Sequence, residues 1–218
     1  MKGDKGEKGS SGLPGSTGLT GPQGAVGQKG TKGDKEDING GTVYVRWGHD
    51  QYPSTAQLVY SGRAGGSWYG NSGSGSNPQC LPLNPTYLKT KIGYETLVSD
   101  IFGAEYETSV FGFAKSVHNH DVVCAVCYVS QRFAVYMVPA QYTCPSGWTR
   151  EYYGYLMAER WNHNRSQYTC IDKALVTVFR TGANNDGLTF YPEEGRCGSL
   201  PCPPYDDNKE LTCAVCTK

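Results

Sequence analysis

Nine cysteines lie between residues 80 and 216, and four of them form two identical tetrapeptides, Cys124-Ala125-Val126-Cys127 and Cys213-Ala214-Val215-Cys216. Two thiols at this spacing could form a redox-active pair or supply half of a four-thiolate zinc site. Neither tetrapeptide lies in a βαβ pattern, however, and the cysteines of secreted proteins usually pair with each other. The cysteines therefore predict a disulfide framework in an oxidising compartment, and their odd number leaves one over. They occupy positions 80, 124, 127, 144, 170, 197, 202, 213 and 216.

Histidines and carboxylates are candidates for metal binding, on a less specific pattern than that of the cysteines. His118 and His120 are two residues apart, so on a strand both imidazoles would share one face and could form half of a metal site, or simply hydrogen-bond to neighbours. Asp186, beside Gly187, and the group Asp206-Asp207-Asn208 could bind calcium, although turn chemistry explains them as well. No serine, histidine and carboxylate are spaced to suggest a catalytic triad, and we do not expect an enzyme.

Two further residue types could act at the surface. Asn164 begins the sequon Asn164-Arg165-Ser166, so it is a candidate for glycosylation in a secreted protein. Sixteen tyrosines all follow residue 43. We expect most of them in β cores and subunit contacts, while a minority could stack on carbohydrate or form oxidative cross-links.

Glycine stands at every third position from Gly3 to Gly33, eleven times in succession. This period is typical of a collagen triple helix, in which only glycine fits at the axis of three wound chains. A flexible linker would not keep a strict phase. We therefore predict a triple helix over residues 3–35, a rod of roughly 100 Å that requires two further copies of the chain.

The predicted rod is poor in stabilising residues, since proline occurs in it only at Pro14 and Pro22. Pro14 occupies a Y position of the Gly-X-Y triplets and is a candidate for hydroxylation. Exposed pairs of lysine and acid at the two ends contribute little singly, so we expect another part of the chain to join three copies. These charge clamps are Lys2, Asp4, Lys5, Glu7, Lys32 and Asp34.

The charge balance limits the classes of partner. The chain carries 20 basic and 20 acidic residues, so neither nucleic acid nor an anionic membrane surface is an expected partner. No apolar run is long enough for membrane insertion. Met1 leads directly into the glycine repeat without a signal peptide, so we expect the native start to have been removed or the sequence to be a fragment.

After a linker over residues 36–41, residues 42–218 form a head that we expect to be mainly β. Its β-branched and aromatic segments predict strands, and stretches of Gly, Ser and Asn at 70–77 and 182–187 predict loops. The predicted strands are Thr42–Trp47, Asp121–Ser130, Arg132–Pro139, Ala174–Phe179 and Leu211–Cys216.

The head also contains an internal repeat. A shift of 92 residues aligns Val43-Tyr44 with Val135-Tyr136 and Tyr60 with Tyr152, and a few residues of slippage align the two Cys-Ala-Val-Cys tetrapeptides. The head therefore divides into two halves, about 42–130 and 131–218. In this alignment Cys144 has Tyr52 as its counterpart, and Cys197 and Cys202 have none.

This cysteine order behind Gly-X-Y triplets resembles the sponge-type (spongin-like) short-chain collagens and, more distantly, the C-terminal non-collagenous domain of type IV collagen. The resemblance covers nearly the whole chain. It rests on Tyr44-Val45-Arg46-Trp47-Gly48, Leu58-Val59-Tyr60-Ser61-Gly62, Ala64-Gly65-Gly66, Val117-His118-Asn119-His120, Cys144-Pro145-Ser146-Gly147-Trp148, Tyr153-Gly154-Tyr155-Leu156-Met157, Cys170, Cys197, Cys202 and the terminal Cys213-Ala214-Val215-Cys216-Thr217-Lys218.

The resemblance implies a disulfide pattern. In the second half it pairs Cys144 with Cys216, Cys170 with Cys213 and Cys197 with Cys202. In the first half it pairs Cys80 with Cys124. Cys127 is then free, or bonded to another molecule, because Tyr52 stands where both family patterns have cysteine.

The resemblance also implies the fold and function. We expect a collagen triple helix plus a mainly-β globular head of two homologous, disulfide-stapled halves, assembled as a homotrimer that is secreted into the extracellular matrix. Its partners would be two copies of itself, a second trimer end to end, and other matrix proteins. No cofactor is expected, with calcium or chloride left open at subunit contacts. The alternative is a soluble defence collagen whose trimeric head binds glycans or microbial surfaces.

Overall fold

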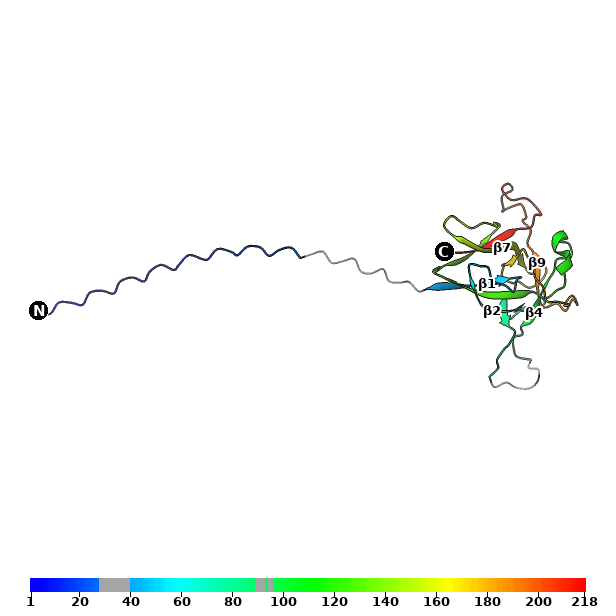
Figure 1. The fold of residues 1–218 in the computed structure, drawn as a ribbon, viewed down its shortest axis with the longest axis horizontal. Helices are drawn as coiled ribbons and strands as arrows, with labels where there is room; N and C mark the ends of the chain where they lie inside the picture. Colours follow the sequence, from blue (N-terminus) through cyan, green and yellow to red (C-terminus); the bar gives the residue numbers. More distant parts are fainter. Residues whose placement is uncertain (28–39, 89–92, 94–95) are drawn as a thin grey trace. The chain divides into compact units, whose positions relative to one another are not determined.

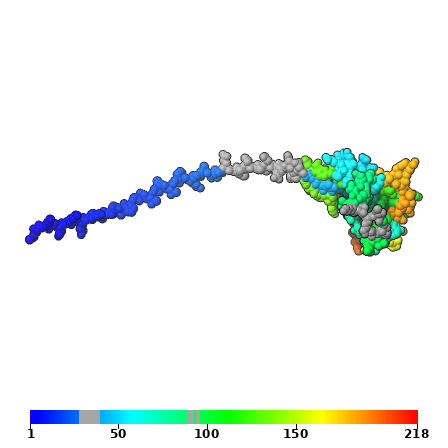
Figure 2. Space-filling model, turned by 90° about the horizontal axis from the view of Figure 1, so that it is seen from below, coloured from blue at the N-terminus to red at the C-terminus, as the bar shows by residue number. Residues whose placement is uncertain are grey.

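The structure, a computed structural model, describes residues 1–27, 40–88, 93 and 96–218. The chain divides into two units, Met1–Asp37 and Ile38–Lys218, with the division inside the predicted linker. In the first unit, residues 1–27 form an extended segment without helix or strand, and their side chains are exposed (Figures 1 and 2). The predicted clamp residues Lys32 and Asp34 lie outside the described residues.

The described part of the second unit contains ten β-strands and one short 3-10 helix (Figure 1). The prediction of a mainly-β head is thereby confirmed. The elements are β1 (Gly41–Trp47), β2 (Gln57–Gly66), β3 (Gln79–Pro82), β4 (Phe102–Tyr106), η1 (Gly112–Val117), β5 (Val123–Ser130), β6 (Val135–Pro139), β7 (Thr149–Ala158), β8 (Thr169–Asp172), β9 (Leu188–Pro192) and β10 (Thr212–Thr217).

The two halves of this unit repeat the same strand pairing. In the first half β5 pairs with β1 and β2, and β2 also pairs with β3 and β4, all antiparallel. In the second half β10 pairs with β6 and β7, and β7 also pairs with β8 and β9, again antiparallel. Strands β1 to β5 therefore correspond in order to β6 to β10.

Close backbone approach explains one pair of glycines that the sequence repeat aligns. A Cβ on Gly62 of β2 would lie 2.0 Å from the carbonyl oxygen of Leu81, and one on Gly154 of β7 would lie 1.8 Å from that of Ile171. Both contacts are far inside van der Waals range and involve backbone. Each half thus needs glycine where its long second strand, β2 or β7, pairs with its short third strand, β3 or β8.

Two parallel pairings join the halves. Strand β4 runs beside β9, and β1 meets β8 where Trp47 lies opposite Ile171. A buried cluster fills the space between the halves, with Tyr44, Ala125 and Val129 from the first half against Tyr152 and Leu156 from the second. The main core is therefore shared by the halves rather than duplicated in each.

The structure corrects one predicted strand. Residues 174–179 form only an isolated bridge, between Thr177 and Val122. Leu175 has a positive φ of 21°, which interrupts an extended chain, and the segment is held by hydrogen bonds to the first half. The other four predicted strands and both predicted loops are confirmed, although β6 begins only at Val135 and Gly41, predicted as linker, already belongs to β1. No helix in the described residues is long and apolar enough to cross a membrane.

Candidate functional site

Four disulfides staple the strands of the second unit. They join Cys80 to Cys124, Cys144 to Cys216, Cys170 to Cys213 and Cys197 to Cys202, which are the four pairs that the family resemblance implies. The two cysteines of each Cys-Ala-Val-Cys tetrapeptide point to opposite faces of their strand, as residues three apart must. Such a framework is typical of proteins that fold in an oxidising compartment.

Cys127 is the one free cysteine among the described residues, and its side chain is fully buried. Its thiol lies 3.7 Å from the carbonyl oxygen of Ala125, and burial raises its pKa. A buried, protonated thiol is a poor nucleophile and cannot reach a second molecule without local opening. Of the two roles expected for Cys127, the single chain therefore favours a free thiol over an intermolecular bond.

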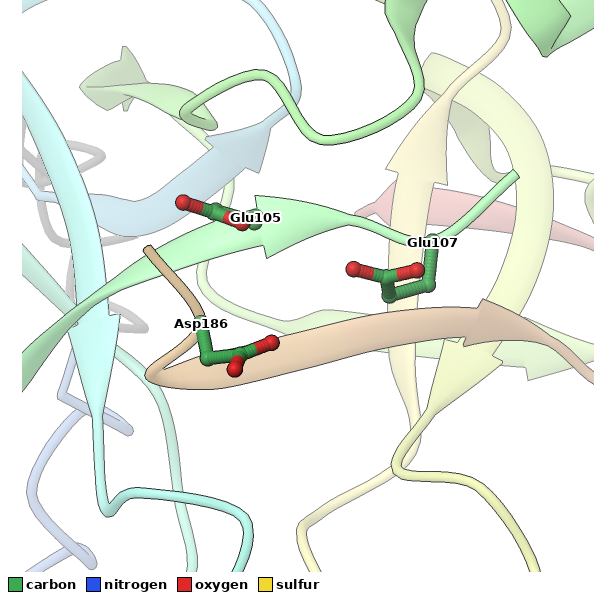
Figure 3. A group of neighbouring side chains, drawn as sticks. All are labelled: Glu105, Glu107 and Asp186. Carbon is green, nitrogen blue, oxygen red and sulfur yellow. The ribbon is translucent and has the colours of Figure 1, made fainter. Parts of the chain in front are cut away.

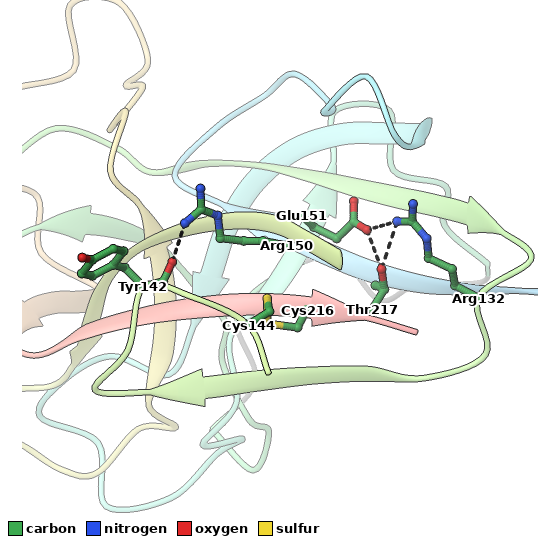
Figure 4. The surroundings of a disulfide bond; sticks show 7 residues. All are labelled: Arg132, Tyr142, Cys144, Arg150, Glu151, Cys216 and Thr217. Atoms are coloured by element: carbon green, nitrogen blue, oxygen red, sulfur yellow. Dashed lines mark hydrogen bonds and ion pairs between the residues drawn. A yellow bond between two sulfur atoms is a disulfide. The ribbon is translucent and has the colours of Figure 1, made fainter. Parts of the chain in front are cut away.

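A buried carboxylate lies where the two halves meet, beside the Cys144–Cys216 disulfide (Figure 4). Glu151 of β7 pairs with Arg132 and accepts a hydrogen bond from the hydroxyl of Thr217. It also accepts hydrogen bonds from Tyr44 (3.2 Å) and Thr55 (2.8 Å) of the first half. A buried charge is tolerated when it is paired and hydrogen-bonded in this way, and here those bonds tie the halves together.

The junction between the halves is built around two tyrosines. Tyr44 of β1 stacks on Tyr152 of β7 at 6.3 Å between ring centroids, and each side chain is 4% exposed. The hydroxyl of Tyr152 lies 3.0 Å from the carbonyl oxygens of Cys170 and Val45. The Tyr152 hydroxyl thus shares its hydrogen between a backbone carbonyl of its own half and one of the first half.

The counterparts of these two tyrosines have no such contact. Tyr136 of β6, the counterpart of Tyr44, is 54% exposed, and Tyr60 of β2, the counterpart of Tyr152, is 36% exposed. The hydroxyl of Tyr60 donates to the carbonyl oxygen of Cys80 (2.9 Å), as that of Tyr152 does to Cys170. Tyr60 is therefore arranged like Tyr152. In the described chain, however, no tyrosine stacks on Tyr60 as Tyr44 of β1 stacks on Tyr152.

The two strands that carry or adjoin these exposed tyrosines, β6 and β3, each have an open edge in the described chain. Among the described residues β6 pairs only with β10, and β3 pairs only with β2. Their counterparts β1 and β8 meet each other inside the chain. An unpaired edge with exposed apolar side chains, such as Val135 and Tyr136 on β6, is a template for a strand from another chain.

The segments that follow β8 and β3 differ in a related way. After β8, the N–H of Val176 donates to the carbonyl oxygen of Gly48 (2.8 Å), and the hydroxyl of Tyr106 donates to that of Val176 (3.0 Å), so this segment docks on the first half. The described residues after β3 instead leave a row of large apolar side chains exposed. These are Leu83, Tyr87, Leu88, Leu97, Val98 and Ile101.

The two candidate histidines do not form a metal site together. They lie in the turn after η1 and not on a strand, because Asn119 between them has a positive φ of 61°. Nδ1 of His118 accepts a hydrogen bond from the N–H of Thr108 (3.2 Å), and Nδ1 of His120 donates to the carbonyl oxygen of His118 (2.9 Å). Both rings thus serve backbone hydrogen bonds, which was the alternative interpretation of these residues.

Asp186, in contrast, has acidic neighbours that the sequence did not indicate. One carboxylate oxygen each of Glu105, Glu107 and Asp186 lies within 4.8 Å of the other two (Figure 3). The group Asp206-Asp207-Asn208 is different, since its carboxylates are already engaged: Asp206 pairs with Lys209, and Asp207 accepts from the N–H of Cys197 (2.9 Å).

Asn164 is exposed and lies at the rim of an open cleft of about 740 Å³. The cleft lies between the β2–β3 loop and the β7–β8 loop, which the internal repeat aligns. Trp68, Trp161 and Tyr168 line it together with serines, Arg160 and Asn71.

The candidate residues of the first unit are all exposed, and within the described chain the charged ones make no ion pair. They are Pro14 and the clamp residues Lys2, Asp4, Lys5 and Glu7.

No protein-family model matches this sequence. Three groups of residues therefore stand out on geometry alone: the open edges with Tyr60 and Tyr136, the three carboxylates, and the aromatic cleft. The repeat alignment contained Tyr60 and Tyr136, but their importance follows only from the different burial of their counterparts. Glu105 and Glu107 carried no signal beyond their spacing of two.

Proposed function

We propose that the protein is a secreted, homotrimeric short-chain collagen whose second unit assembles three chains and brings their Gly-X-Y segments into register. The observation that carries this proposal is the incomplete repeat of the junction between the halves. Within one chain β1 and Tyr44 meet β8 and Tyr152, whereas the matching elements β6, Tyr136, β3 and Tyr60 are left open.

The open elements lie far apart in the sheet of the described chain, with β6 at one end beside β10 and β3 beside β2, so they do not meet within one chain. If β6 of one chain lay beside β3 of the next, Tyr136 would stack on Tyr60 as Tyr44 stacks on Tyr152. The Tyr60 hydroxyl would then reach the carbonyl of Met137, the counterpart of Val45. Each chain would offer one donor and one acceptor surface, which is a head-to-tail contact of the kind that forms a ring when its rotation closes.

The apolar segment after β3 would gain its partner in the same contact. Its counterpart after β8 docks at Gly48, a left-handed residue at the end of β1 (φ 80°). The matching residue after β6 is Ala140, which is also left-handed (φ 59°). We therefore infer that the described apolar residues after β3, in 83–88 and 97–101, pack on the neighbouring chain near Ala140.

The glycine repeat supplies the number of chains. In the single chain a Cβ added to any glycine from Gly3 to Gly27 would meet no atom within 4 Å. The strict period thus has no cause inside one chain, and the crowded axis of three wound chains supplies one. Three heads in a ring would hold the three segments at high effective concentration.

The hydrogen bonds of β6 suggest a selective test. Ala134 and Lys218 exchange two backbone hydrogen bonds of 3.1 Å, so in an antiparallel pair the N–H of Val135 points away from β10 toward the open edge. Val135→Pro should remove an edge donor without breaking the β6–β10 pair. In sedimentation equilibrium, we expect wild-type chains to have three times the mass of one chain, or six times if trimers join end to end.

Val135→Pro should shift the protein toward monomer, while Val135→Thr, which keeps the N–H, should stay trimeric. Near-ultraviolet circular dichroism would show whether each variant is folded. A wild-type protein that is monomeric at micromolar concentration, with folded heads, would refute the proposal.

The aromatic cleft favours a second function, binding of glycans by a soluble defence collagen. Exposed indole and phenol rings stack on sugar faces, and the surrounding amide, hydroxyl and guanidinium groups can bond to sugar hydroxyls. A glycan array with and without calcium would test it, with Trp161→Ala expected to abolish any signal. Binding that survives in Trp161→Ala would place recognition elsewhere, and an empty array would count against this function.

A further inference from the structure

We propose that Glu105, Glu107 and Asp186 bind one calcium ion at the seam between the halves, a role independent of the trimer proposed above. Glu105 lies on β4, Glu107 follows it, and Asp186 precedes β9, the strand that runs beside β4 (Figure 3). Residues 105 and 107 are two apart on an extended chain, so their side chains share one face. That face is the one on which Asp186 lies.

The position of Asp186 depends on its tight turn. Asp186 has a φ of 60° and Gly187 a φ of 119°. A Cβ on Gly187 would lie 2.2 Å from the carbonyl oxygen of Gly103, so the turn can pack against β4 only with glycine there. The backbone thus fixes a carboxylate from the second half against two from the first.

Glu105 provides the observation that points to a ligand. Its side chain is 99% buried, since only 1% is exposed. One carboxylate oxygen accepts a hydrogen bond from the N–H of Asn185 (2.8 Å), while the other, Oε2, has no hydrogen-bond partner. Glutamate is almost never fully buried without a counter-charge, and an orphan buried oxygen is costly.

Protein groups in the described chain do not supply that counter-charge. No lysine or arginine described in the structure forms an ion pair with any of the three carboxylates. His118 lies 3.5 Å from Glu107, but its Nδ1 accepts the hydrogen bond from Thr108, so that nitrogen carries no proton for Glu107. Burial and the neighbouring acids accordingly raise the pKa of both Glu105 and Glu107.

The chemistry and the spacing fit calcium. Hard divalent cations take carboxylate oxygens, and two oxygens on opposite sides of a calcium ion are separated by about 5 Å. The three oxygens here lie within 4.8 Å of one another. Magnesium demands a nearly ideal octahedron at shorter distances, which three carboxylates on two separate segments satisfy less well. An extracellular site of this kind would have a dissociation constant of roughly 0.1–1 mM.

The test uses the full-length chain, first stripped with EGTA and then titrated with calcium by isothermal calorimetry. We expect one site per chain, weaker binding of magnesium, and a higher melting temperature with calcium. Asp186→Asn and Glu107→Gln should each weaken binding by at least about tenfold, a loss of the size that perturbed metal sites usually show. Asp206→Asn, in the other acidic group, is the matched control and should bind like wild type.

The competing explanation is a proton shared between the carboxylates. In that case calcium would change the melting temperature of neither the wild type nor Glu105→Gln. That outcome, or a wild-type titration without heat or thermal shift, would overturn the proposal. Equal loss of binding in Asp206→Asn would overturn it too. A monomeric protein that still binds calcium would leave this site standing while refuting the trimer.

Discussion

Cys127 and Tyr52 mark a place where the first half keeps one cysteine of a disulfide that is complete in the second half. The matching cysteines, Cys144 and Cys216, form a disulfide at a sequence separation of 72. Because the strand pairing of the halves is the same, position 52 should lie where Cys144 lies in the second half. The free thiol of Cys127 is then the remnant of a pair that is complete in the other half.

Tyr52→Cys should therefore restore this disulfide. A loop of roughly 75 residues predicts a gain of about 2–4 kcal/mol in the free energy of unfolding, because the unfolded chain loses entropy. Peptide mass mapping would identify the new bond, and denaturation with and without reductant would measure its effect. Tyr52→Ser is the control, which should give no gain. A folded Tyr52→Cys variant in which the introduced thiol stays unbonded would show that the two halves differ locally.

The buried carboxylates Glu105 and Glu107 predict that the stability of the protein depends on pH. Burial raises the pKa of Glu105 and Glu107 above their ordinary value of 4.5, and the charge of Asp186 adds repulsion at both. An acid whose pKa is higher in the folded state favours folding while protonated, so stability in EGTA should fall as the pH rises from about 4.5 through the raised pKa values. Calcium should remove this loss, because it stabilises the ionised form.

Urea denaturation at several pH values, with EGTA or with calcium, would measure this dependence. Glu105→Gln tests the cause of the dependence, because the calcium-free fall should become smaller when this carboxylate is replaced. A stability curve that is the same with and without calcium across this range would contradict the expectation.

At the scale of the elements, the sequence predicted those strands whose β-branched residues stand in an uninterrupted row, β1, β5, β6 and β10. It did not predict β2 and β7 as strands, because Gly62, Gly154 and their glycine-rich ends weaken the β signal. Those glycines are needed for backbone approach, which only the fold reveals. The carboxylate cluster was hidden for a similar reason, since β4 and the turn at Asp186 are about 80 residues apart and meet only through a parallel pairing.

The unequal exposure of matching tyrosines gives a prediction about these elements. Tyr60→Ala and Tyr136→Ala should each leave the chain folded but weaken association by at least about tenfold, since buried aromatic anchors dominate interfaces. If the rings meet across two chains, the double variant should lose less than the sum, with a coupling of about 0.5–1.5 kcal/mol.

Dilution of the proposed trimer in the analytical ultracentrifuge would measure both effects. Tyr168→Ala, an exposed tyrosine of the cleft, is the control and should associate normally. Additive losses for Tyr60 and Tyr136 would mean that the two rings lie in separate contacts, and the pairing of β6 with β3 would then have to be abandoned.

For the whole molecule, the central question is which unit drives assembly. In the proposed trimer, eleven triplets with two prolines would form a weak triple helix, and pairs of exposed charges would add little to it. Three separate segments at micromolar concentration must also lose the entropy of coming together. Attachment to the proposed ring of three heads would convert this into a nearly unimolecular step at an effective concentration in the millimolar range.

Cleavage between Asp37 and Ile38 should therefore unwind the Gly-X-Y segments while the heads stay trimeric. The circular dichroism band of the triple helix would report winding, and sedimentation would report the mass of the heads. Replacing the head with an unrelated trimerising domain should restore part of the winding, because proximity alone accounts for most of the effect. The opposite result would be segments that stay wound after cleavage while the heads dissociate into monomers. It would mean that the glycine repeat, and not the head, drives assembly.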